Sequence, residues 1–74
     1  MSVIESCMLN EFVERYSYKK AAAICDVNYM RMWMMVENWV PVRIITTNGV
    51  YYAWKGGKLL NTITESALQR RGIE

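Results

Sequence analysis

Apolar side chains in the first part of the chain recur with the spacing of one helix face. Within residues 8–16, apolar positions fall at i, i+3, i+4 and i+7, with charged side chains between them. These apolar positions are Leu9, Phe12, Val13 and Tyr16. The spacing predicts a first helix from Met8 to about Tyr16. Before it, Val3 and Ile4 are candidate strand residues.

Two shorter helices are predicted next, each with its own start signal. Ser17 suits the N-cap of a helix over residues 19–25, because its hydroxyl oxygen accepts from an amide of the first turn. That segment is rich in alanine, the strongest helix former. Asn28 suits the N-cap of a third helix, from Tyr29 to about Asn38. Pro41 cannot continue this helix, which therefore ends before it.

The third helix is predicted to be apolar nearly all round. Its apolar residues are Met30, Met32, Trp33, Met34, Met35 and Val36. A helix of this kind either has both faces covered or exposes a face that has a binding role.

The plainest local signal is a β-hairpin over residues 42–54. Two runs of β-branched and aromatic residues flank Asn48-Gly49, the pair that supplies the two positive φ values of a type I′ turn. The turn fixes the register, so Arg43 is expected opposite Trp54, where a cation–π pair is predicted. Other opposed pairs are Thr47 with Val50, Ile45 with Tyr52, Thr46 with Tyr51, and Ile44 with Ala53.

The C-terminal residues give weaker signals. Gly56-Gly57 is expected to break the strand, and residues 58–63 suit either a further strand or a turn. Thr64 suits the cap of a terminal helix that reaches Arg71. The sequence therefore predicts a small α+β fold. It is a single domain over residues 1–74 in which three N-terminal helices, containing a helix-turn-helix, precede a β-hairpin and a short C-terminal extension.

Charge is unevenly distributed although the net charge is only +2. Residues 1–14 carry three glutamates and no Lys or Arg. Residues 15–58 carry seven basic side chains against two acidic ones, a surplus of five. Such a surplus favours a polyanionic partner through counterion release, although an ordinary solvated surface has the same composition.

Composition argues against several function classes. The chain has no His, and its acidic residues show no close pairing, so no catalytic set is expected and the protein is predicted not to be an enzyme. Cys7 and Cys25 cannot supply the four ligands of structural zinc, and we expect two buried, reduced thiols and no cofactor. No signal peptide and no membrane span is expected, which predicts a cytoplasmic location.

The second and third predicted helices fit the frame of a helix-turn-helix. Ala22 falls where a small residue admits the next helix, and Val27 falls at the first buried position after the turn. Met32 and Met35 fall at the two buried positions of the recognition helix. Asp26 occupies the place where Gly is commonest, and Asp tolerates left-handed geometry better than most residues.

Two families of small phage DNA-binding proteins have similar patterns. The segment LNEFVERYSYKKAAAICDV resembles the opening of lambda-type Cro repressors, in which three helices also precede a β-hairpin. The segment YKKAAAICDVNYMRMWMMVENWVPVRI resembles the excisionase type of winged helix, in which Val-Pro follows the recognition helix and a hairpin wing comes next. Both resemblances imply binding to double-stranded DNA in a bacterial host cell.

The resemblance implies roles for particular residues. The recognition helix, about residues 28–38, would face the major groove or its phosphates with Asn28, Tyr29, Arg31, Trp33, Met34 and Glu37. Phosphate contacts are expected from Lys19, Lys20, Arg43, Lys55 and Lys58. A homodimer is expected, through a hairpin face formed by Ile45, Val50, Tyr52 and Trp54.

Three functions remain open from the sequence. The first is a sequence-specific transcriptional regulator of the Cro type. The second is an excisionase-like factor that bends DNA at recombination sites and contacts an integrase. The third is a phage protein whose apolar third helix binds a host protein, because a surface rich in Met and Trp is adaptable and apolar.

Overall fold

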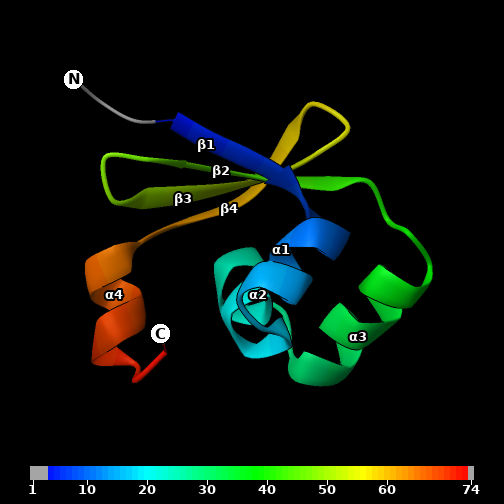
Figure 1. The fold of residues 1–74 in the computed structure, drawn as a ribbon, viewed down its shortest axis with the longest axis horizontal. Helices are drawn as coiled ribbons and strands as arrows, with labels where there is room; N and C mark the ends of the chain where they lie inside the picture. The colour runs from blue at the N-terminus through cyan, green and yellow to red at the C-terminus, as the bar shows by residue number, and fades with distance from the viewer. Residues whose placement is uncertain (1–3, 74) are drawn as a thin grey trace.

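The computed structural model describes residues 4–73, so Val3 lies outside the described part. This part of the chain forms an N-terminal strand, three helices, three further strands and a final helix (Figure 1). In order they are β1 (Ile4–Met8), α1 (Leu9–Arg15), α2 (Tyr18–Cys25), α3 (Tyr29–Glu37), β2 (Val42–Thr47), β3 (Val50–Lys55), β4 (Lys58–Thr64) and α4 (Glu65–Arg70). The α+β fold, with three helices before the hairpin, is the one that the sequence predicts.

The predicted hairpin forms with the predicted register. Arg43 pairs with Trp54, Ile45 with Tyr52 and Thr47 with Val50. The turn residues Asn48 and Gly49 have φ values of 50° and 74°, the positive values that a type I′ turn requires.

The sheet is larger than the hairpin alone. Its four strands are antiparallel and lie in the order β1-β2-β3-β4. β1 pairs along its whole length with β2, from Ile4 with Thr47 to Met8 with Arg43. Gly56-Gly57 ends β3 as the sequence predicts, and φ values of 55° and 84° make it a second tight turn that returns the chain into β4, so residues 58–63 form a further strand, one of the two predicted options. A bulge beside Ala53 and Trp54 interrupts the β3–β4 register.

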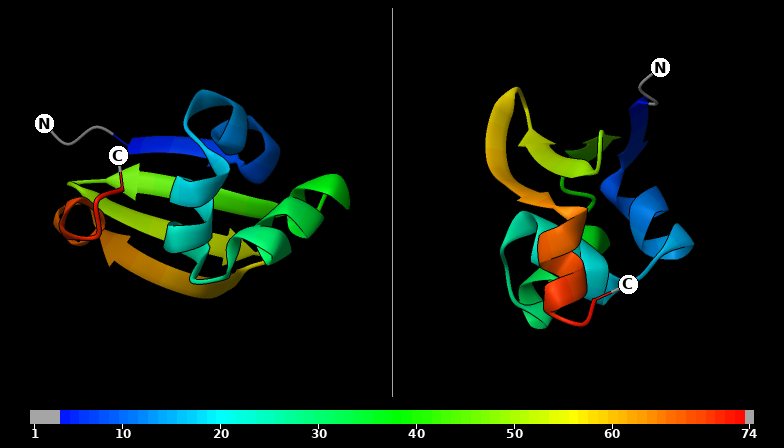
Figure 2. Two further views of the ribbon diagram at one scale, coloured as in Figure 1. Left: turned by 90° about the horizontal axis from the view of Figure 1, so that it is seen from below. Right: turned by 90° about the vertical axis from the view of Figure 1, so that its left-hand side faces the viewer.

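The described helices all pack on one face of the sheet (Figures 1 and 2). Between them lies an apolar core in which Leu9, Ile24 and Met32 are fully buried. The sheet contributes Val42, Ile44 and Ala53 from its inner face, and burying each large side chain of this core stabilises the fold by roughly 1.5–3 kcal/mol. Residues Leu68 and Ile73 bring α4 and the residues after it into the same core.

Three side-chain N-caps fix where helices begin, and all three are those that the sequence predicts. Ser17 Oγ accepts from the Lys20 amide at 3.0 Å, and Asn28 Oδ1 accepts from the Arg31 amide at 2.7 Å. Thr64 Oγ1 accepts from the Ala67 amide at 3.1 Å. Each cap satisfies an amide that has no partner within its helix.

No helix within residues 4–73 covers the other face of the sheet, which we call the open sheet face (Figure 2). It consists of alternate strand positions, since successive residues of a strand point to opposite sides. These positions are Ile4, Ser6 and Met8 in β1, Arg43, Ile45 and Thr47 in β2, Val50, Tyr52 and Trp54 in β3, and Leu59, Thr62 and Thr64 in β4. None of the helices within residues 4–73 is long and apolar enough to span a membrane.

Candidate nucleic-acid interface

The turn between α2 and α3 has the geometry of a helix-turn-helix. Asp26 ends α2 in the left-handed conformation, with φ 59° and ψ 48°, as its place in the sequence frame predicts. The Val27 amide donates to the Ala22 carbonyl at 3.0 Å, which closes a Schellman-type helix end. These contacts turn the chain sharply, so α3 starts at a fixed angle to α2.

Packing holds the two helices together through the four residues that the sequence frame predicts. Ala22 and Met32 are buried in the core. Val27 and Met35 are partly buried and pack against it. The small Ala22 side chain allows close approach of α3, and the long Met side chains fill the space between helix and sheet.

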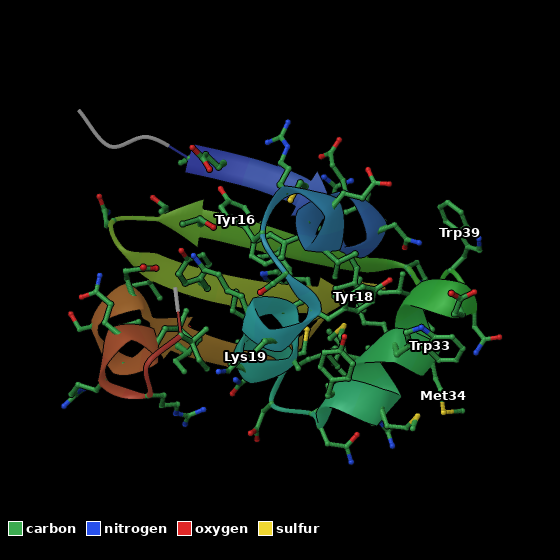
Figure 3. All side chains as sticks on the ribbon, turned by 60° about the horizontal axis from the view of Figure 1, so that its bottom comes forward. Tyr16, Tyr18, Lys19, Trp33, Met34 and Trp39 are labelled. Atoms are coloured by element: carbon green, nitrogen blue, oxygen red, sulfur yellow. The ribbon has the colours of Figure 1, made fainter. Side chains whose placement is uncertain are left out.

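The opposite face of α3 projects into solvent. Tyr29, Met30, Trp33 and Met34 are between 46% and 65% exposed. Arg31 and Glu37 are exposed as well. Figure 3 shows Trp33 and Met34 directed away from the sheet. The recognition-helix residues predicted from the sequence are therefore exposed, on the sides of α3 that the core leaves uncovered.

Asn28 has the capping role that the sequence predicts, in addition to its predicted place at the groove. Its carboxamide oxygen caps α3 by accepting from the Arg31 amide. A bidentate contact with adenine needs both the oxygen and the nitrogen of an Asn carboxamide. The oxygen of Asn28 is therefore engaged at the helix end, and its contact with DNA stays a prediction.

A surface hollow of about 340 Å³ joins α3 to the β3–β4 hairpin. Arg31 of α3 and Lys55 at the end of β3 both line it, together with Asp26 of the turn. The hairpin that flanks α3 is thus the one with Lys55 and Lys58 on either side of its glycines. Lys55, for which a phosphate contact is predicted, therefore lies beside α3, and Lys58 pairs with it across the turn.

The Asn48-Gly49 turn lies at the other end of the sheet from α3 (Figure 1). Its Gly49 carbonyl accepts from the Glu65 amide at 2.8 Å, so the turn packs against the start of α4. It is therefore not a wing beside the recognition helix.

Lys20 was predicted to contact phosphate, and the structure contradicts this. The side chain is buried, with Nζ 3.9 Å from Glu65 Oε2. It lies over the rings of Tyr16 and Tyr51, at 4.7 and 5.2 Å from their centroids. Burial raises the pKa of Tyr51, and the neighbouring Glu65 carboxylate raises that pKa further. The burial of Lys20 could not be predicted from its neighbours in the sequence, because its acidic partner belongs to α4 and only the tertiary structure brings the two together.

Lys19, the next residue along α2, stays exposed. In Figure 3 it lies apart from Trp33 and Met34. Lys19 is therefore the basic residue of the α2 pair that stays available to a partner, at a distance from the apolar face of α3.

Arg43 and the predicted dimer residues lie on the open sheet face. Arg43 is exposed, and Ile45, Val50, Tyr52 and Trp54 are partly buried. The predicted cation–π pair of Arg43 with Trp54 does not form. Among the described residues the cation–π contacts are those of Lys20. The Arg43 guanidinium instead donates to Ser6 Oγ at 2.8 Å and so reaches toward β1, on the other side of β2 from Trp54.

Trp39 is a residue that the sequence analysis missed. It is 76% exposed and has a left-handed backbone with φ 51°. The Val40 amide donates to the Met35 carbonyl at 3.0 Å, so Trp39 occupies the place that Gly favours at the end of a helix. Figure 3 shows Trp39 projecting near the end of α3. The sequence signal for this residue was its position two residues before Pro41. Because Pro excludes helix continuation, the helix must end close to Trp39.

The two cysteines are free. Cys25 is buried, and burial raises its pKa to about 11, so the thiol stays protonated at neutral pH. Cys7 is only partly buried, against the expectation that both thiols are enclosed, because it lies on the edge strand β1. Burial also raises the pKa of Cys7.

Comparison with protein-family models, with curated proteins and with solved structures finds no match to this chain. Its function is therefore argued from its own residues and geometry.

Proposed function

We propose that this protein binds double-stranded DNA, with α3 in the major groove and the β3–β4 hairpin on a flanking phosphate backbone. The observation that carries the proposal is the outward face of α3 beyond the Asp26 turn. A B-DNA major groove is about 12 Å wide and admits one α-helix. Because Met32 and Val36 anchor α3 from behind, its outer face is available along its whole length.

Basic side chains flank α3 in positions that suit phosphate. Arg31 and Lys55 line one hollow, and Lys58 lies across the tight turn from Lys55. Lys19 is exposed on α2. Each phosphate contact contributes about 0.9 to the slope of log affinity against log salt. Three or four such contacts therefore give a slope of roughly −3.

Base recognition would be largely apolar. Met30, Trp33 and Met34 suit contact with thymine methyl groups. We therefore propose a transcriptional regulator that acts as a two-fold dimer on half-sites about one helical turn apart, in the cytoplasm of a bacterial host. The excisionase alternative predicts several copies loading cooperatively on one DNA.

The test is affinity for a 20-base-pair duplex, measured by fluorescence anisotropy over a salt series. Arg31→Gln and Lys55→Gln are each expected to weaken binding and to lower the salt slope by about one. Arg70→Gln is the matched control, because it removes the same charge from α4, at the end of the molecule away from α3 (Figure 1). Affinity that does not change with salt, or equal losses for the three variants, would overturn the proposal.

A second candidate function is favoured by one observation. Four apolar residues of α3 and the adjacent Trp39 are exposed, a patch typical of protein-binding surfaces. Trp residues at the centre of such patches commonly carry binding energy. If the protein binds a host protein through this patch, Trp33→Ala is expected to abolish that binding, while Lys19→Gln and Arg31→Gln leave it intact. Pull-downs from bacterial extract with these three variants distinguish the two functions.

A further inference from the structure

The open sheet face presents two aromatic side chains on an inner strand. Tyr52 and Trp54 point to the same side of β3, because alternate residues of a strand share a face. β3 lies between β2 and β4, so both rings stand in the middle of the sheet. The helices cover the opposite face only (Figure 2). Both side chains are partly exposed and stand about 7 Å apart along the strand, room for one base on each ring.

The charge of this face favours an anion. Arg43 is its charged residue, and its other described positions are apolar or carry hydroxyl groups. The nearest acidic residue of the sheet, Glu5, pairs with Thr46 and therefore points to the helix side. A phosphate group that reaches the open sheet face meets one positive charge and no acidic side chain from the described strands.

A hollow of about 380 Å³ lies beside these groups. Arg43 and Trp54 line it on the sheet, and Gly56-Gly57 line it at the β3–β4 turn. The hydrogen bond from Arg43 to Ser6 draws the guanidinium toward β1, on the far side of β2 from Trp54. Arg43 and Trp54 nevertheless line the same hollow, which thus combines an aromatic side chain with a basic one, the two groups that bind a base and its phosphate in single-strand complexes.

We propose that the open sheet face binds single-stranded DNA, with bases stacked on Tyr52 and Trp54 and the backbone held by Arg43. Stacking on aromatic rings tolerates any base and requires unpaired bases, which excludes an intact duplex from this surface. The binding of an unpaired strand does not depend on the function proposed above.

The choice of DNA over RNA does rest on the proposed function. The β3–β4 hairpin borders both surfaces, because Gly56-Gly57 line the hollow of the open sheet face and Lys55 lines the hollow beside α3. The two surfaces therefore meet at this hairpin, which favours a strand of the same DNA over RNA as the ligand of the open sheet face.

The experiment measures anisotropy of a labelled thymidine oligonucleotide of about 12 nucleotides with the full chain. Trp54→Leu keeps an apolar side chain on the sheet but removes the stacking ring, and Tyr52→Leu does the same at the second position. Each is expected to weaken oligonucleotide binding about tenfold to a hundredfold. Arg43→Gln is expected to weaken it and to reduce its salt dependence. Circular dichroism establishes that each variant is folded.

Controls separate this proposal from the first one. Arg31→Gln, on α3, is expected to weaken duplex binding and to leave oligonucleotide binding unchanged, and Trp54→Leu is expected to do the reverse. Wild-type affinity of folded Trp54→Leu for the oligonucleotide would overturn the proposal. A uridine oligonucleotide of the same length is measured alongside the thymidine one. Tighter binding of the uridine oligonucleotide would overturn the assignment to DNA. A dimer in solution that Trp54→Leu converts to a monomer would show that this face is the dimer interface predicted from the sequence, and would equally overturn the proposal that it binds single-stranded DNA.

Discussion

Replacing Glu65 with Gln is expected to destabilise this fold strongly, because it leaves a buried cation without its partner. Lys20 is 5% exposed, and its Nζ lies 3.9 Å from Glu65 Oε2. That oxygen is itself buried and accepts no hydrogen bond from the described residues. The change to Gln retains the shape of the side chain and removes only its charge.

The magnitude follows from the distance and the burial. Two unit charges at this separation interact by roughly 4 kcal/mol at an effective dielectric constant of 20. The Glu65 side chain is 34% exposed, so solvent screens part of this energy, and Lys20 keeps its contacts with two tyrosine rings. We therefore expect a loss of about 2–3 kcal/mol. A chain of this length has a total stability of roughly 4–11 kcal/mol, so the loss is a large fraction.

Urea denaturation followed by far-ultraviolet circular dichroism measures this loss. Glu14→Gln, which removes the same charge at an exposed position of α1, is the matched control and is expected to change stability by less than about 0.5 kcal/mol. The double variant Lys20→Met with Glu65→Gln is expected to recover most of the loss, because an apolar side chain of similar length replaces the buried cation.

A Glu65→Gln loss as small as that of Glu14→Gln would refute the reasoning. It would mean that Lys20 reaches solvent, and a Lys20→Gln variant would then be expected to weaken DNA binding. Wild-type DNA affinity of the folded double variant, in contrast, is the result expected if Lys20 serves only to attach α4.

Three further changes test other parts of the structure. In urea denaturation, Trp39→Gly is expected to have a free energy of unfolding about 1 kcal/mol higher than Trp39→Ala, because φ 51° strains every side chain but Gly. Equal stabilities of the two variants would argue against the left-handed backbone. Asn28→Ala is expected to lower stability by about 1 kcal/mol through loss of the α3 cap, and Asn28→Ser to restore most of it. The pKa of Cys25 rises from 9.0 to about 11 on folding, so the unfolded chain releases this proton at a lower pH than the folded protein does. Stability is therefore expected to fall between pH 9 and 11, by up to about 2–3 kcal/mol. Urea denaturation over this pH range should show a smaller fall in Cys25→Ala.

Several features of this protein were determined by residues that are neighbours in the sequence. The caps Ser17 and Asn28 act on amides three positions away. The Asn48-Gly49 turn fixes the register of β2 against β3, because a two-residue loop leaves one pairing that satisfies both strands. The left-handed Asp26 was predictable for the same reason, since helix ends depend on a few consecutive residues.

Part of the candidate site was predictable by the same means. The periodicity of α3 assigned Met32 to the core and Trp33 to the outer face, and both positions are confirmed. The capping role of Asn28 is confirmed, while its contact with DNA stays a prediction, because a capping side chain and a base-reading side chain have the same chemistry. Whether α3 meets DNA or a protein stays a prediction, since exposure alone does not identify a partner.

Only the tertiary structure decided which distant segments meet. β1 pairs with β2 across more than thirty residues of intervening chain, and no local pattern marks that partner. Lys20 has the same sequence signal as Lys19, yet α4 brings Glu65 to one of them and leaves the other in solvent. The hairpin that lies beside α3 was likewise set by the packing of the sheet. Local patterns fix backbone geometry within a few residues, whereas burial and charge pairing depend on side chains that only the complete fold brings together.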